Sequence, residues 1–310
     1  MVALALLPSF ASALIITGAA PRQMPRTSAP VMQMLYPDEA AWLTDTLMSR
    51  SVENQVQTFG EVNNRGLQIW LHGKWTKFFE EQKEQKQKGR LYDFLNVLRT
   101  SGTEDFFVPM PGFRQLSPNN PYLKTAGGRS SQGFTLEIEP PKVGLQLMAV
   151  REDLAGVWVQ HLERISTLTE PSSNRTQASM AHTISNAAAD SQMLRSVATK
   201  VAVREMLSDI AHLPSQKEKH EWLSTFVLVT HAKSLTREGD VEVMIQAIGT
   251  QPLHIRGKAL VDPMEIQRDL LKRTAQVSEK FGKVLPETVA TEHATVQTSF
   301  LETCLRITNS

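Results

Sequence analysis

The sequence predicts a mostly α, multi-helix soluble protein with two helical halves joined by a long loop rich in proline and glycine. Apolar residues recur at three- and four-residue steps in most segments after residue 37, as they do along one face of a helix. This periodicity fails from 102 to 133, where four prolines fall. The composition, 41% hydrophobic and 21% charged, is ordinary for a soluble globular chain. The predicted segments are a leader, 1–37, an N-terminal helical segment, 38–101, a loop or linker, 102–133, and a C-terminal helical domain, 134–308.

The clearest apolar stripe runs from Val143 to Ile165 and predicts a core helix of about 23 residues. Arg151 starts from its apolar side. A guanidinium keeps its proton, so it either reaches solvent along its stem or meets an acceptor inside the protein. The helix has no acidic residue at 147, 148, 154 or 155, one turn away on either side. A buried acidic partner therefore has to come from another segment. Arg151 is then either a clamp between helices or a receptor for the anion of a ligand.

The N-terminal helical segment opens at Pro37 and contains the densest aromatic cluster of the chain, between residues 67 and 79. Trp70 and Trp75 belong to this cluster, together with two phenylalanines. Such a group is typical of core packing. The alternative is a platform for a planar ligand such as a pigment.

The loop from 102 to 133 is longer than the usual connection, which indicates an interdomain linker or a functional loop. The sequence GFTLEIE, which begins at Gly133, predicts a short strand before the two prolines that open the central helix.

The C-terminal domain reads as helices separated by breaks. The alanine-rich stretch 178–213 favours a helix, and Asp262 followed by Pro263 is a strong helix start. Within 241–261 both helical and alternating patterns occur, and we favour the helix over a hairpin. Pro286 is expected to separate the helix that begins at Pro263 from a last helix.

Charge and cysteine content narrow the function classes. Lysine plus arginine, 33, nearly cancels aspartate plus glutamate, 32, so no nucleic-acid partner is expected. The single cysteine, Cys304, excludes an internal disulfide framework, and the scattered histidines give no metal-ligand spacing. No serine-nucleophile elbow or dinucleotide fingerprint is present. The sequence therefore predicts no metal and no cofactor, and favours a role other than that of an enzyme.

Arg256 and Lys258 alternate with His254, so in an extended segment they share one face and could hold a phosphate or carboxylate. Isolated surface charges are the simpler interpretation.

The first 37 residues contain no acidic residue. An apolar run from Val2 to Leu7, continued weakly to Ile16, is too short to span a bilayer and reads as a secretory-type signal. The following AAPRQMPRTSAPVMQ has the composition of an organelle transit peptide. A signal followed by a transit segment resembles the two-part plastid leaders of algae with complex red-lineage plastids, and implies a chloroplast protein of the stroma or thylakoid surface. A simple secretory or mitochondrial leader is the alternative.

The string VREDLAGVW in the central helix resembles plant and algal chloroplast proteins of unknown function, in which a helix of this type recurs. The resemblance covers about 20 residues, supports the plastid address and implies no activity.

Two function hypotheses follow. The first is a plastid binding, assembly or regulatory factor whose partners are other plastid proteins. No transmembrane span is expected after the leader, and peripheral membrane contact stays open. The second is an enzyme or carrier that binds an anionic or planar small molecule between helices, with Arg151 gripping the anion and Trp70 and Trp75 lining the pocket. A deep pocket containing Arg151 favours the second hypothesis, and a filled core with an apolar surface patch favours the first.

Overall fold

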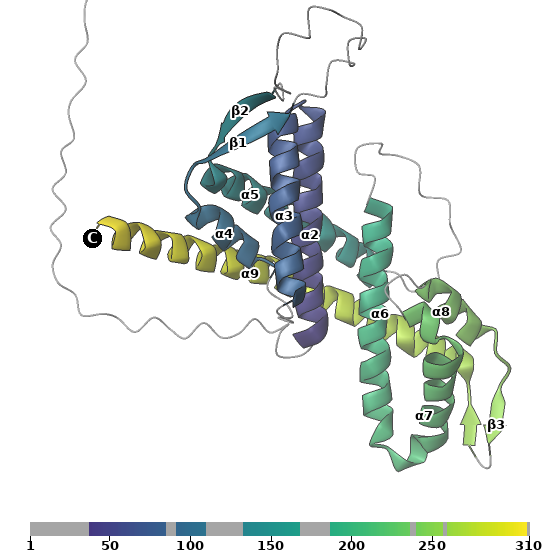
Figure 1. The fold of residues 1–310 in the computed structure, drawn as a ribbon. Coiled ribbons are helices and arrows are strands. Elements are labelled where there is room, and N and C mark those ends of the chain that lie inside the picture. The colour runs from purple at the N-terminus through teal and green to yellow at the C-terminus, as the bar shows by residue number, and fades with distance from the viewer. Residues whose placement is uncertain are drawn as a thin grey trace, which may run out of the picture.

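The computed structural model describes residues 37–84, 91–109, 133–167, 187–235, 240–256 and 259–308. These residues form a mostly α fold with two small antiparallel sheets of two strands each (Figure 1). The main helices are α2 (Pro37–Glu61), α3 (Arg65–Glu84), α4 (Asp93–Thr100), α5 (Pro140–Ser166), α6 (Ala187–Ala211), α7 (Lys217–Ser224), α8 (Val241–Gly249) and α9 (Pro263–Thr308). The short turns are η2 (Pro214–Gln216), the π-helix η3 (Thr225–Thr230) and η4 (Ala232–Leu235). The strands are β1 (Glu104–Pro109), β2 (Gly133–Ile138), β3 (His254–Arg256) and β4 (Ala259–Val261).

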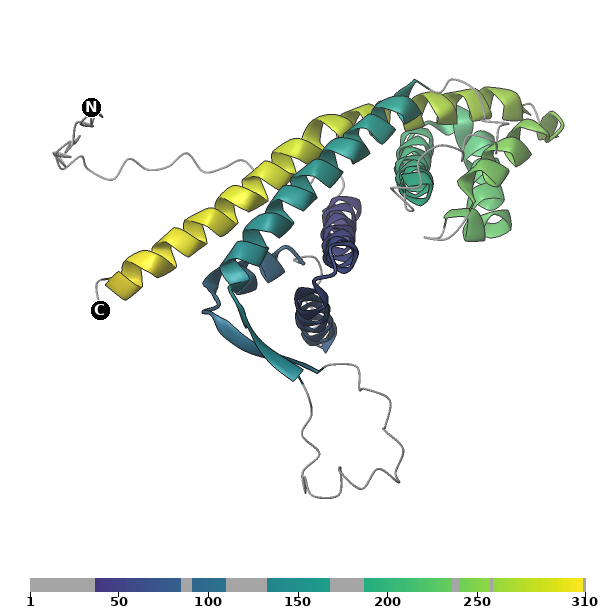
Figure 2. The ribbon, with the colours of Figure 1, turned by 90° about the horizontal axis from the view of Figure 1, so that it is seen from above.

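The long helices α5 and α9 lie side by side and form the spine of the molecule (Figure 2). Helices α2 and α3 pack as a pair across this spine and are seen nearly end-on in Figure 2. The turn between them passes through Asn63, which has a φ of 57°, a left-handed conformation that asparagine tolerates better than most residues. Helix α6 crosses the spine further along, where α7, α8 and the β3–β4 hairpin also pack.

Buried apolar side chains form two clusters, and α2, α5 and α9 contribute to both. One cluster joins the C-terminal part of α5 to α6, α7, α8 and the first part of α9. The other joins the N-terminal part of α5 to α3, α4 and the later part of α2. The spine therefore connects the two clusters. The domain boundaries stay a prediction.

The central helix is confirmed as α5, and its buried residues follow the predicted stripe. Five of them are apolar residues that the spacing placed on one face, namely Leu147, Leu154, Trp158, Leu162 and Ile165. The strand expected from GFTLEIE is also confirmed, as β2. The start at Asp262 is formed as expected, because its Oδ1 accepts the backbone N–H of Met264 at 2.9 Å.

The expected break at Pro286 is wrong, because α9 continues through it from Pro263 to Thr308. Proline removes one helical hydrogen bond and crowds the carbonyl four residues earlier. Here the flanking residues Phe281, Leu285 and Val289 are all buried in one core cluster. Their burial on both sides of the proline outweighs the local cost and keeps the helix continuous.

Two other segments differ in part from the expectation. The predicted loop 102–133 begins with strand β1, which pairs antiparallel with β2, and its remainder, 110–132, lies outside the described residues. The preferred helix for 241–261 is right for α8 but wrong for the rest, which forms the β3–β4 hairpin. Within 241–261 the apolar pattern could not separate helix from strand, because Val241 and Ile245 satisfy both periods.

Candidate functional site

Arg151 is fully buried where α5 meets α9. Its Nη2 donates to Oε2 of Glu292 on α9, and the side chain of Glu292 is 10% exposed. Nε and Nη1 of Arg151 are also buried and have no hydrogen-bond acceptor among the described residues. The acidic partner thus comes from a segment 141 residues further along the chain, and the pair joins the two spine helices.

Other ionisable groups surround this pair. Burial raises the pKa of Glu292 above its ordinary value, and the charge of Arg151 opposes that rise. Burial also raises the pKa of Asp45 on α2, whose carboxylate is repelled by Glu292. Burial, with the nearby charge of Arg151, lowers the pKa of His293 to about 4, so its ring is neutral at neutral pH. The site therefore holds one permanent cation among carboxylates that are poorly solvated.

This charged group lies between the two apolar clusters. On α5, Met148 belongs to one cluster and Leu154 to the other, with Arg151 between them. On α9, Val289 and Val296 bracket Glu292 and His293 in the same way. A buried ion pair fixes the relative register of two helices more strictly than apolar contacts do, because sliding either helix leaves a buried charge unpaired.

A second polar network links α2, α5 and α6, and no pattern in the sequence predicts it. Asp190 on α6 is 3% exposed, and its Oδ2 accepts the indole N–H of Trp158 at 3.1 Å. Its Oδ1 lies 3.3 Å from Nε of Arg50 on α2. Arg50 also donates from Nη1 to Glu53 at 2.8 Å. Spacing could not predict this network, because its members share no helix apart from Arg50 and Glu53.

The aromatic cluster on α3 is packed into the core. Trp70 is 2% exposed, and its indole N–H donates to Glu104 on β1 at 3.2 Å. Trp75 is half-buried and lies against Phe78 and Phe94, with ring centroids 6.0 and 5.1 Å away. The structure thus does not bring Trp70 and Trp75 together with Arg151, which contacts α9 instead.

Of the two predicted anion-binding residues, Arg256 ends strand β3, and its side chain is not described. Lys258 lies outside the described residues. The expectation that they share a face stays a prediction.

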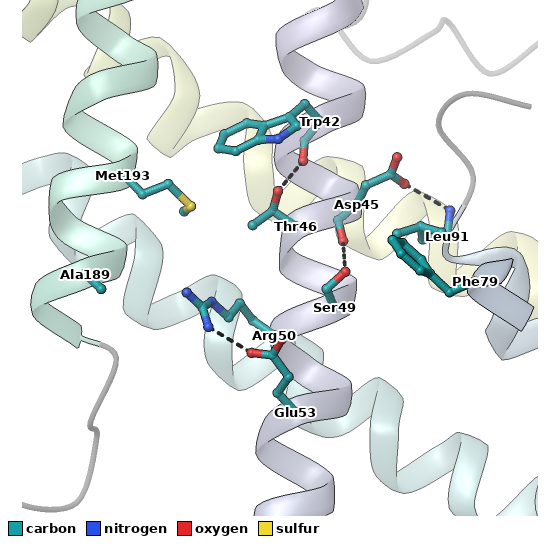
Figure 3. Close-up of a pocket in the computed structure, with 10 residues that line it drawn as sticks. All are labelled: Trp42, Asp45, Thr46, Ser49, Arg50, Glu53, Phe79, Leu91, Ala189 and Met193. Carbon is teal, nitrogen blue, oxygen red and sulfur yellow. Dashed lines mark hydrogen bonds and ion pairs between the residues drawn. The ribbon is translucent and has the colours of Figure 1, made fainter. Parts of the chain in front are cut away.

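A cavity of about 520 Å³ lies over one face of α2. Figure 3 shows its lining, with α6 on one side and Phe79 and Leu91 on the other. The described residues that line it are Trp42, Asp45, Thr46, Ser49, Arg50, Glu53, Phe79, Leu91, Ala189 and Met193. Arg151 is not one of them, although it lies close enough to Asp45 to affect its pKa.

Across the described ranges, no group of three or more His, Cys, Asp or Glu side chains is placed to hold a metal ion. Within the same part of the chain, no helix has both the length and the apolar character needed to cross a membrane. Comparison of the chain with protein-family models, with curated proteins and with solved structures found no match.

Proposed function

We propose that this protein is a non-enzymatic binding or assembly factor of the plastid, and that it binds a partner protein through the outer face of the β3–β4 hairpin. The observation that carries the proposal is the exposure of two apolar side chains that face each other across this hairpin. Ile255 is 80% exposed and Leu260 is 64% exposed, and they are paired in the strand register.

The inner face of the same hairpin is covered. Val261 is 3% exposed, and the ring of His254 lies 5.7 Å from that of Trp222 on α7. A strand places alternate side chains on opposite faces, so Ile255 and Leu260 point away from α7. Small sheets are stable when helices cover their apolar faces. The occupant we propose for the outer face is therefore an apolar helix face of a different protein.

The π-helix η3, which follows α7 directly, adds further exposed apolar surface at this end of the molecule. Leu228 is 55% exposed and Val229 is 74% exposed. π-Helical turns cost stability relative to α-helix and are found frequently at functional sites. The exposed apolar residues of η3 therefore support the proposal that the partner binds at this end of the molecule.

The test replaces Ile255 and Leu260 together by lysine and compares proteins that copurify with the tagged chain from its native organelle. Val62→Lys is the matched control, because Val62 is 66% exposed on the turn between α2 and α3. A partner retained by wild type and control but lost from the double variant supports the proposal. Once identified, the purified partner should bind the double variant about tenfold or more weakly, because two apolar side chains lose their burial.

Equal binding of that partner to wild type and double variant would overturn the proposal. Sedimentation velocity of the isolated protein provides a second check. A dimer of the wild type that dissociates in the double variant would assign this face to a second copy of the chain, and the partner-protein proposal would then be wrong.

The plastid address rests on the leader and has its own test. Removal of a signal and transit segment should leave a mature N-terminus between about Ala29 and Pro37. N-terminal sequencing of the accumulated protein should find it there. An intact leader on the accumulated protein would refute the plastid assignment.

A further inference from the structure

The cavity over α2 has a lining that is specific in its chemistry and that is separate from the hairpin face. Its volume, about 520 Å³, lies within the range of small-molecule sites. Trp42 and Phe79 contribute aromatic rings, and Leu91 and Met193 contribute apolar surface. The remaining polar lining residues decide which ligand would fit.

The only cation that lines the described part of the cavity, Arg50, is already engaged. Its Nη1 lies 2.8 Å from Glu53, and its Nε lies 3.3 Å from Asp190. Figure 3 shows Arg50 directed toward α6 and Asp45 directed the opposite way, toward Leu91. Arg50 is therefore surrounded by carboxylates, and an anionic ligand would have to compete with both.

Among the described residues, Asp45 is the lining carboxylate that has no cation in direct contact, whereas Glu53 is paired with Arg50. Its Oδ1 accepts the backbone N–H of Leu91 at 2.9 Å, and Oδ2 has no donor among the described residues. Within the part of the chain that the structure describes, the positive charge that acts on Asp45 is that of Arg151, and Arg151 is hydrogen-bonded to Glu292 instead. Glu292 and Asp93 add repulsion, and burial together with this repulsion raises the pKa of Asp45. A cation placed beside Asp45 would relieve the cost of keeping it ionised.

The two hydroxyl groups that line the described part of the cavity already donate their hydrogens to backbone oxygens. Thr46 donates to the backbone oxygen of Trp42 at 2.7 Å, and Ser49 donates to that of Asp45 at 3.1 Å. A hydroxyl whose hydrogen is used keeps lone pairs that can accept. The hydroxyls of Thr46 and Ser49 therefore add acceptors to the carboxylate of Asp45, which suit a ligand that donates several N–H bonds.

We propose that this cavity binds an organic cation, an ammonium or guanidinium carried on an apolar or flat body, with Asp45 as its counter-ion and Trp42 and Phe79 as its aromatic walls. An aromatic face attracts a cation through its quadrupole, and this adds to the attraction of the carboxylate. The same chemistry is offered by a free amine and by a lysine or arginine side chain of a partner protein.

The test measures binding to the full chain by calorimetry with three probes of nearly the same shape. Tryptamine is the cation, tryptophol is its neutral counterpart, and indole-3-acetate is the anion. We expect tryptamine to bind about tenfold or more tightly than tryptophol, and indole-3-acetate more weakly than either, because only the cation gains a charged hydrogen bond with Asp45. Equal binding of tryptamine and tryptophol, or preference for the anion, would overturn the proposal.

Two variants keep the result specific to the site. Asp45→Asn removes the charge but can still accept the N–H of Leu91, and it should weaken tryptamine binding about tenfold or more. Ala189→Phe fills the rim of the cavity without changing its charge and should also reduce binding. Asp209→Asn is the matched control, because Asp209 lies on α6 away from the cavity, with its side chain 60% exposed in a pair with Arg273. Unchanged affinity in Asp45→Asn, with thermal unfolding showing a folded protein, would refute the role of Asp45.

A capped alanine pentapeptide with arginine at its centre separates the two sources of the cation. Tighter binding of the peptide than of tryptamine assigns the site to a partner's side chain, and the reverse order assigns it to a free amine. Failure of all cationic probes to bind would overturn this inference. It would leave the hairpin proposal untouched, because no described residue of the hairpin lines the cavity and the hairpin has its own test.

Discussion

Replacing Arg151 by methionine separates its two possible roles. Methionine keeps most of the apolar stem and removes the charge, so Glu292 loses the donor that now contacts it. As a clamp between α5 and α9, Arg151 should contribute mainly to stability. As a grip for a ligand, it should contribute to binding and little to stability.

The magnitude follows from the burial of the partner that remains. The side chain of Glu292 is 10% exposed, so the variant would hold a buried carboxylate without a cation. Breaking a buried pair in this way costs about 3–5 kcal/mol. For a protein of this size, each kcal/mol shifts the midpoint of thermal unfolding by about 2–4 °C, so we expect a loss of about 10 °C.

The pH dependence gives a second signature. The pKa of Glu292 is already raised by burial, and removing Arg151 should raise it further. An acid whose pKa is higher in the folded state than in the unfolded state binds more protons when folded, so it costs stability as pH rises above its unfolded pKa. The deficit of Arg151→Met should therefore be smallest near pH 5 and larger at pH 7.5, measured by denaturant unfolding against wild type at each pH.

The double variant Arg151→Met with Glu292→Leu should recover at least half of the lost stability, because no charge is left buried. Lys283→Met is the control, since its pair with Glu279 is largely exposed and solvent screens it, so its loss should leave the midpoint nearly unchanged. A wild-type midpoint in Arg151→Met, or no recovery in the double variant, would refute the clamp.

Three further predictions concern other buried groups. Trp158→Phe should lower the free energy of unfolding by about 1–3 kcal/mol, because buried Asp190 loses its indole donor. Denaturant titration measures this free energy, and an unchanged value would show that solvent replaces the donor. Pro286→Ala should stabilise the protein by about 1–3 kcal/mol by restoring a helical hydrogen bond in α9, and a lower thermal midpoint would contradict this. The pKa of His293 is lowered from 6.5 to about 4 in the folded state. As pH falls, the unfolded state therefore binds a proton before the folded state does, and the free energy of unfolding should decline between about pH 6.5 and pH 4. His293→Gln should reduce this decline by up to about 3 kcal/mol, and an identical pH profile would refute it.

The sequence by itself determined the fold class and most helices. The stripe along α5 and the start at Asp262 are local patterns, and the structure forms both. Side-chain spacing reports which face of an element is buried, because the period of a helix is fixed by its own backbone. The sequence also restricted the partner of a buried Arg151 to another segment, since no acid lies one turn away on its helix.

Only the tertiary structure decided which residues meet. No local sequence pattern identifies Glu292 as the partner of Arg151, and none identifies Asp190 as the acceptor of the Trp158 indole N–H. The continuity of α9 through Pro286 likewise depends on burial against neighbouring elements. The cavity over α2 combines side chains from α2, α3, Leu91 and α6, which no single periodicity relates. These features depend on how helices cross, and the crossing is set by long-range packing, whereas a periodic pattern records only the orientation of each helix toward the core.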